Sequence, residues 1–315
     1  MPAAERVAVR WASYTSAKDG REHTGVVVDG AIHGLPSPHT LLGLIRDDGL
    51  EQAGREAMAA PWEKVALDAA ALLAPIPTPP SIRDFMSFEN HVVTSMAALG
   101  GTVDPVWYEQ PVFYFTNPAA VTRPHDDIPI SPGSEHFDFE LEVAAVIGRA
   151  GSDIPLGEAE GYIAGYTILC DWSARDLQER EMRVGLGPAK GKDTATSFGP
   201  VMVTPEELEP FRKDKGFDLE MTVAVNGRRY STGNWSSIYW SFPQMISYAS
   251  RGTTLRPGDV IGSGTVGTGC ILELARVHGS QEFPWLAAGD RVRIEIEQLG
   301  AVESRIVPGA APVQI

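Results

Sequence analysis

Two apolar runs in the middle of the chain constrain its fold most, because each is a strand pattern that carries acids. The first run begins at Phe139 and alternates apolar residues with Glu140 and Glu142. This alternation is typical of a β-strand. Since residues two apart in a strand point to the same face, the two glutamates project together from the face opposite Phe139 and Leu141.

The second run, residues 166–170, ends abruptly at Asp171. An acid that ends an apolar strand lies where binding sites are often built. If Glu140, Glu142 and Asp171 converge, their charges repel each other and favour protonation. A hard divalent cation removes this conflict, and oxygen ligands suit Mg²⁺, Mn²⁺ or Ca²⁺. The alternative interpretation of Glu-x-Glu is one solvated face of an antiparallel sheet, because so short a motif matches freely.

The overall charge and the few cysteines limit the classes of partner. With 315 residues, 43% of them hydrophobic, the chain is long enough for one large domain and a smaller one. A formal net charge of −15 disfavours nucleic acid and anionic membranes as partners. The first residues lack the apolar region of a signal peptide, and no run reaches transmembrane length. Because Cys170 and Cys270 lie in apolar contexts, we expect buried free thiols in a cytoplasmic protein. The expected partner is a small-molecule carboxylate substrate, which the acidic net charge does not exclude.

A proline-rich segment divides the chain. Four prolines lie within residues 75–80, which cannot form a helix or a central strand. We therefore expect a small N-terminal domain over residues 1–75 and a larger domain over residues 76–315. The elements predicted in the first domain are a strand over residues 7–11, a hairpin turning at Asp29-Gly30, and helices over residues 41–46 and 51–60.

The larger domain carries further candidate side chains. Residues 82–92 fit helical spacing, and on such a helix Asp84 and His91, seven residues apart, share a face. The apolar run over residues 270–274 is predicted to be a strand that holds Glu273. The other predicted elements are a hairpin turning at Asn226-Gly227, a helix over residues 241–251 and a charged strand over residues 288–297.

The Glu-x-Glu strand and the motif Asp-Trp-Ser-x-Arg-Asp that begins at Asp171 together resemble the fumarylacetoacetate hydrolase family, whose metal site combines them. The resemblance extends over roughly residues 80–300, with five motifs in the family's order. It implies an α+β fold in which a mixed β-roll catalytic domain follows a small N-terminal β-containing domain. It also implies a homodimer.

The same resemblance implies roles for individual residues. The implied metal ligands are Asp84, Glu140, Glu142 and Asp171, of which Asp84 matches an Asp ligand seven residues before the catalytic His of eukaryotic-type fumarylacetoacetases. The implied catalytic residues are His91 as general base, Glu273 as the carboxylate that orients it, and Lys192, with Lys190 as the alternative. The implied substrate-binding residues are Tyr114, Arg175, Gln178 and Thr265. For Arg175, a structural pairing with Asp176 or Glu179 is the alternative.

The activity that the resemblance implies is Mg²⁺-, Mn²⁺- or Ca²⁺-dependent hydrolysis of a C–C bond in a 2,4-diketo acid. Met86 and Met182 stand where fumarylacetoacetases place tyrosines, which predicts a less polar pocket. Thr94 stands where the smaller acylpyruvases and oxaloacetate decarboxylases have the Glu of a His-x-x-Glu pair, although Glu89 could substitute. The alternatives are an isomerase, hydratase or decarboxylase of 2-oxo diacids in aromatic catabolism, and a non-catalytic metal- or ligand-binding homologue.

Overall fold

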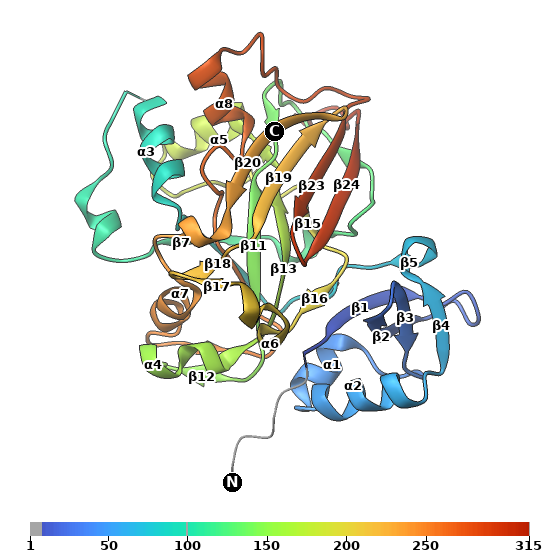
Figure 1. The fold of residues 1–315 in the computed structure, drawn as a ribbon. Coiled ribbons are helices and arrows are strands. Elements are labelled where there is room, and N and C mark those ends of the chain that lie inside the picture. Colours follow the sequence, from blue (N-terminus) through green and yellow to red (C-terminus); the bar gives the residue numbers. More distant parts are fainter. Residues whose placement is uncertain (1–7, 99, 315) are drawn as a thin grey trace.

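A computed structural model describes residues 8–98 and 100–314 and shows an α+β protein built on one long mixed sheet (Figure 1). Along this sheet the strand order is β4 (Glu63–Ala66), β3 (Ala31–Gly34), β2 (Glu22–Val28), β1 (Arg10–Thr15), β16 (Met202–Val203), β13 (Ile163–Asp171), β11 (Leu141–Ile147), β22 (Val260–Gly262), β6 (Ile82–Phe85) and β7 (Phe113–Thr116). Off this path, β15 (Thr196–Phe198) pairs with β13 and β8 (Val121–Thr122), and β5 (Ala71–Leu72) pairs with β1.

The centre of the sheet is the antiparallel pair β11 and β13, the two runs that the sequence marked as strands. Every residue of both strands is buried. A second sheet packs against this pair, so that Val143 and Ile168 share one apolar core with Met221 and Ile294. Its strand order is β20 (Arg228–Asn234), β19 (Glu220–Val225), β23 (Arg291–Ile296), β24 (Gly300–Val307) and β9 (Ile128–Pro129). The acids of β11 and β13 are therefore held in a fully buried part of the molecule, where close packing limits their movement.

The N-terminal elements gather beside the larger part of the chain, drawn in blue in Figure 1. They comprise β1–β5 with helices α1 (Leu41–Arg46) and α2 (Leu50–Ala59). The predicted hairpin is confirmed, because Asp29 and Gly30 both adopt the positive φ that its tight turn requires. The predicted first strand begins only at Arg10, and Val7 lies outside the described residues. Since Arg10 pairs with Val203, the N-terminal strands continue the main sheet, and the division near residue 75 stays a prediction.

The remaining helices and short strand pairs surround the two sheets. The helices are α3 (Glu89–Ala98), α4 (Leu156–Ala159), α5 (Arg175–Met182), α6 (Pro205–Leu208), α7 (Phe242–Ala249) and α8 (Ile271–His278). The short pairs are β10 (Phe137–Asp138) with β14 (Ser173–Ala174), β12 (Gly151–Ser152) with β21 (Thr254–Leu255), and β17 (Arg212–Lys213) with β18 (Gly216–Phe217). The predicted hairpin at Asn226-Gly227, the helix after Ser241 and the strand before Glu297 are confirmed. Among the described residues, no helix is long and apolar enough to span a membrane.

Two predicted elements are wrong. Residues 82–92 are not one helix, because Ile82–Phe85 form β6 and α3 begins only at Glu89. Strand β6 lies between β22 and β7, and this tertiary pairing overrides the helical spacing of a few aromatic residues. Residues 271–274 are the first turn of α8 and not a strand. An apolar run this short fits either structure until its hydrogen-bond partners are known.

Candidate metal centre and catalytic site

Four carboxylates converge where the central strands meet β6. Asp84 lies in β6, Glu142 lies in β11, Glu140 precedes β11 by one residue, and Asp171 ends β13. One oxygen of each lies within 4.8 Å of one oxygen of every other, and all four residues are buried. The close approach of β6 needs a glycine, because a Cβ on Gly262 would come within 2.5 Å of Oδ1 of Asp84. The structure thus brings together the acids predicted as metal ligands.

Burial and mutual repulsion shift the pKa values of these acids. Burial and the charge of Asp171 raise the pKa of Asp84 to about 7. Burial raises the pKa of Asp171 to about 6, although the charge of Lys192 opposes this. Burial and the charge of Asp84 raise the pKa of Glu142 well above its ordinary value. Burial also acts on Glu140, but there the charges of Lys192 and Arg175 outweigh it and lower the pKa.

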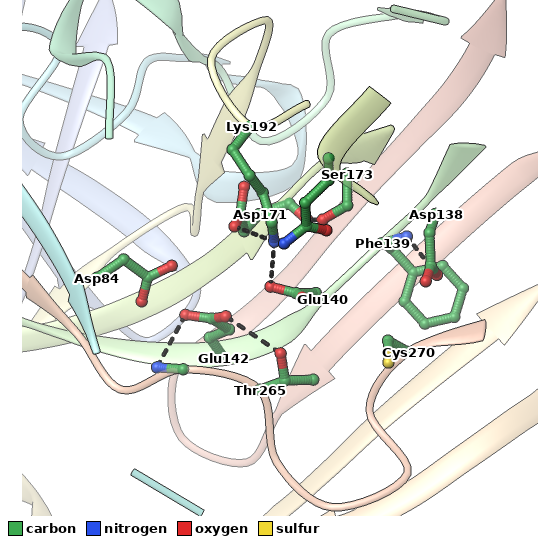
Figure 2. A network of polar contacts seen from close by, with 12 residues as sticks. Asp84, Asp138, Phe139, Glu140, Glu142, Asp171, Ser173, Lys192, Thr265 and Cys270 are labelled. Carbon is green, nitrogen blue, oxygen red and sulfur yellow. Dashed lines mark hydrogen bonds and ion pairs between the residues drawn. The ribbon is translucent and has the colours of Figure 1, made fainter. Parts of the chain in front are cut away.

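Hydrogen-bond donors surround the cluster, as Figure 2 shows for Lys192 and Thr265. Lys192 Nζ donates to Glu140 Oε2 and Asp171 Oδ2, both at 2.6 Å. Tyr114 Oη donates to Asp171 Oδ2 at 2.6 Å and to Asp84 Oδ2 at 3.3 Å. Glu142 accepts from Gly264 N at 3.1 Å and from Thr265 Oγ1 at 3.4 Å. Lys190 instead lies 2.7 Å from Asp193 and is mostly exposed, so Lys192 is the lysine of this cluster.

The donor set fits a divalent cation. Four carboxylates face two protein cations, Lys192 Nζ and Arg175 Nη2. Within the part of the chain that the structure describes, Oδ1 of Asp84 and Oδ1 of Asp171 are buried without a hydrogen-bond partner. Buried acceptors left in this state are costly, and a hard cation with oxygen ligands satisfies them. These four acids could therefore hold Mg²⁺ or a similar ion, with its charge balancing the excess of carboxylates.

A histidine–carboxylate pair lies beside the acids. His91 Nδ1, in the first turn of α3, is 3.0 Å from Oε2 of Glu273, in the first turn of α8. Both residues are buried, and Cys270 Sγ lies 3.6 Å from the same Glu273 oxygen. His91 is close enough for its charge to contribute to the lowered pKa of Glu140. The prediction that Asp84 and His91 share a helix is wrong, but strand β6 and helix α3 still bring both residues to this site.

Arg175 and Gln178 lie on α5, and Arg175 contacts the Glu140 oxygen that Lys192 does not contact. Arg175 Nη2 is 2.7 Å from Glu140 Oε1, and Nη1 donates to Gln178 Oε1 at 3.2 Å. Its Nε donates to Asp138 Oδ2 at 2.8 Å, and the residue is only 8% exposed. The alternative partners were wrong, because Asp176 accepts from Ser134 Oγ and Glu135 N, while Glu179 pairs with Arg183. Contact of Arg175 with a substrate stays a proposal.

A cavity of about 240 Å³ opens next to the acid cluster. It lies between β7 and the loop that leads to Lys192, and Tyr114 and Lys192 belong to both the cavity and the cluster. Its lining is completed by Phe115, Thr116, Asn117, Pro188, Ala189 and Asp193. This mixed lining offers room beside the acids for an organic substrate.

Asp138 is a buried acid of the site for which the sequence suggested no role. It is fully buried and bonds to Arg175 and to the start of α8. The available signal was its place two residues before Glu140, since the acids at 138, 140 and 142 follow one alternation. Sequence alone could not show that two of its partners lie more than a hundred residues away, in α8.

Comparison with known proteins places the chain in one family of enzymes. The family model described as fumarylacetoacetate (FAA) hydrolase C-terminal matches residues 81–307. The oxaloacetate tautomerase YisK of Bacillus subtilis is 32% identical over 247 residues, 76% of this chain and 74% of the relative. The 2,4-didehydro-3-deoxy-L-rhamnonate hydrolase of Sphingomonas sp. (strain SKA58) is 29% identical over 224 residues, 70% of each chain. The solved structure of a fumarylacetoacetate hydrolase (EaFAH) from Exiguobacterium antarcticum matches with a TM-score of 0.74 at 25% identity, covering 96% of this chain and 100% of that one.

Proposed function

The chain belongs to the fumarylacetoacetate hydrolase family, and we propose that it is a divalent-metal-dependent hydrolase that cleaves a C–C bond in a 2,4-diketo acid. An acylpyruvate or a compound like fumarylacetoacetate is the proposed substrate class. The observation that carries the proposal is the buried cluster of four carboxylates beside the His91–Glu273 pair. Such a site combines oxygen ligands for a hard cation with a base held by a carboxylate.

In this proposal Asp84, Glu140, Glu142 and Asp171 hold Mg²⁺, or Mn²⁺ or Ca²⁺. When bound there, the cation supplies Lewis-acid stabilisation of negative charge on the oxygens of a 2,4-diketo acid. The four carboxylates are buried by the surrounding protein, and electrostatic effects are stronger in such an environment than in bulk water. A cation held there would favour the charged forms of Asp84 and Glu142, whose pKa values are raised in its absence.

His91 is the proposed general base. It takes a proton from water, whose oxygen adds to the distal carbonyl carbon of the substrate. The C–C bond then breaks, its electron pair remains on the pyruvate-type fragment as an enolate, and protonation of that carbon completes the products. Glu273, 3.0 Å from Nδ1, fixes the ring and stabilises the imidazolium that forms. A base so placed typically contributes about 10²–10⁴-fold to the rate.

The substrate carboxylate and the developing charge are assigned to the donors around the cluster. Lys192, Tyr114 and Thr265 already donate to the ligand carboxylates, and Lys192 and Tyr114 also line the cavity. Arg175, which contacts Glu140 Oε1, and its neighbour Gln178 are the remaining residues proposed to bind the substrate. Phe115, Pro188 and Ala189 give the otherwise polar cavity an apolar part, which we assign to the distal group of the substrate. We further propose a cytoplasmic homodimer.

A second candidate is a metal-dependent isomerase, tautomerase, hydratase or decarboxylase of 2-oxo diacids. The similarity to an oxaloacetate tautomerase at 32% identity favours it. Such an enzyme uses the same stabilised enolate without hydrolysing a C–C bond. The acid cluster serves both candidates equally, so the distinction rests on His91 and its access to water.

Incubation of the purified full chain with an acylpyruvate and Mg²⁺ separates the two candidates. Hydrolysis yields pyruvate and the matching carboxylic acid in equal amounts, each equal to the diketo acid consumed. Oxaloacetate, followed in parallel for ketonisation and for release of carbon dioxide, tests the second candidate. Loss of the enol absorbance without two products would refute hydrolysis.

A further inference from the structure

Asp138 makes four hydrogen bonds that join two parts of the site. Its Oδ1 accepts from the backbone N–H of Ile271 at 2.7 Å and of Phe139 at 2.8 Å. Its Oδ2 accepts from the backbone N–H of Leu272 at 3.0 Å and from Arg175 Nε at 2.8 Å. The carboxylate is fully buried, so water does not compete for these positions. We propose that Asp138 is a positioning residue that fixes the metal-binding half and the base half of the site relative to each other; its catalytic consequence rests on the proposed function.

The first branch runs from Asp138 to the base through helix α8. The N-cap residue of α8, Cys270, makes no side-chain capping bond, and the carboxylate of Asp138 accepts from the first two N–H groups instead. These groups have no partner within the helix. Glu273 is the next residue, in the same first turn, and lies 3.0 Å from His91. A shift at this end of α8 therefore displaces the carboxylate that orients the base.

The second branch runs from Asp138 to the acid cluster through Arg175. The Nε of Arg175 donates to Asp138, while Nη2 lies 2.7 Å from Glu140 Oε1. A guanidinium is planar, and its Nε and Nη2 donors form a rigid fork. With Nε hydrogen-bonded to Asp138, Nη2 has a fixed place, and its ion pair then holds the Glu140 oxygen in position. Partners behind a metal ligand commonly affect metal affinity in this way.

Loss of the α8 cap alone would be a simpler explanation of a defect in an Asp138 variant, and the chain offers a matched control for this effect. Ser241 caps α7, which has eight residues like α8, and its Oγ accepts from Gln244 N at 3.4 Å. Helix α7 packs against α4, and none of the proposed site residues lies on it. Ser241→Ala therefore removes a cap, with its cost in stability, and leaves both branches intact.

The test uses the purified full chain, freed of metal, at a temperature below unfolding of every variant. Mn²⁺ affinity is followed by the loss of the free-ion electron paramagnetic resonance signal, and kcat is measured with an acylpyruvate at saturating Mn²⁺. We expect Asp138→Ala to lower both Mn²⁺ affinity and kcat about 10–100-fold. Ser241→Ala should leave both within twofold of the wild type. A loss in only one quantity, no loss in either, or an equal loss in Ser241→Ala would overturn the proposal.

Two further variants keep the test open if Asp138→Ala does not fold. Asp138→Asn has the same shape, but either orientation of its amide turns NH₂ towards one of the two α8 donors, so kcat should fall. Arg175→Lys breaks the fork, so Mn²⁺ affinity should fall, and adding Asp138→Asn to it should not weaken Mn²⁺ binding further. An unchanged kcat in Asp138→Asn together with an unchanged Mn²⁺ affinity in Arg175→Lys would overturn the proposal. If the wild type binds Mn²⁺ but hydrolyses no acylpyruvate, the proposed function fails while the Mn²⁺ measurements still test the Arg175 branch.

Discussion

Asp84→Asn should stabilise the metal-free protein at high pH. The pKa of Asp84 is raised from 3.8 to about 7, so the folded state disfavours its ionised form. An acid whose pKa is higher in the folded state than in the unfolded state does not destabilise the protein at a pH below the unfolded-state pKa. Above that pH it lowers the free energy of unfolding, increasingly so until the group is ionised in both states. At 1.36 kcal/mol per unit, the cost reaches ~4 kcal/mol near pH 8. The amide keeps the shape of the side chain without its charge, so the variant avoids this cost.

The assay is urea denaturation of both proteins in EDTA, at pH 4 and at pH 8. From pH 4 to pH 8, we expect the free energy of unfolding of the variant to rise relative to that of the wild type by up to ~4 kcal/mol. With Mg²⁺ at about 100 times its dissociation constant, the wild type should gain ~3 kcal/mol, and the variant much less because it lacks one ligand. Asp259→Asn is the control, because this buried acid already faces Arg83 and its neutralisation should destabilise. A variant less stable than wild type at pH 8, with an undiminished Mg²⁺ response, would refute the reasoning.

Three further predictions concern separate parts of the site. Glu142→Ala should abolish the rise in melting temperature with Mg²⁺ or Mn²⁺, and an unchanged rise would remove Glu142 from the ligand set. At saturating Mn²⁺, Arg175→Lys should lower kcat/KM for carboxylate-bearing diketones far more than for neutral ones, because lysine cannot replace a planar fork, and equal losses would mean that Arg175 does not bind the substrate carboxylate. Glu273→Gln should lower turnover less than His91→Ala, and the double variant should be little worse than His91→Ala alone, as measured by steady-state kinetics. Additive losses would separate Glu273 from His91.

The sequence predicted the elements whose pattern is strictly local. The alternation around Glu140 and Glu142 and the acid that ends β13 are visible because strand geometry fixes which side chains share a face. The turn at Asp29-Gly30 is equally local, since its residues accept positive φ. These local features left a solvated sheet face as the alternative, and the resemblance to a known family favoured convergence of the acids.

The incorrect elements depended on distant partners. Residues 82–85 form a strand because β22 and β7 supply its hydrogen bonds, and nothing near Asp84 in the sequence shows this. Residues 271–274 start a helix whose first N–H groups are satisfied by Asp138. Local propensity is a weak guide where tertiary hydrogen bonds decide the structure. The role of Asp138 was missed for the same reason.

The central claim is that His91 activates water while the four acids hold the metal. It is tested most directly by His91→Ala, measured for Mn²⁺ affinity, oxalate binding, acylpyruvate hydrolysis and exchange of the ketone hydrogens in D₂O. The account predicts nearly unchanged Mn²⁺ and oxalate binding, retained exchange, and hydrolysis lowered by about 10²–10⁴-fold. Equal loss of exchange and hydrolysis would contradict the role of His91 as base for water. Undiminished hydrolysis would contradict the assignment of His91 as the base that activates water, and with it the proposed mechanism.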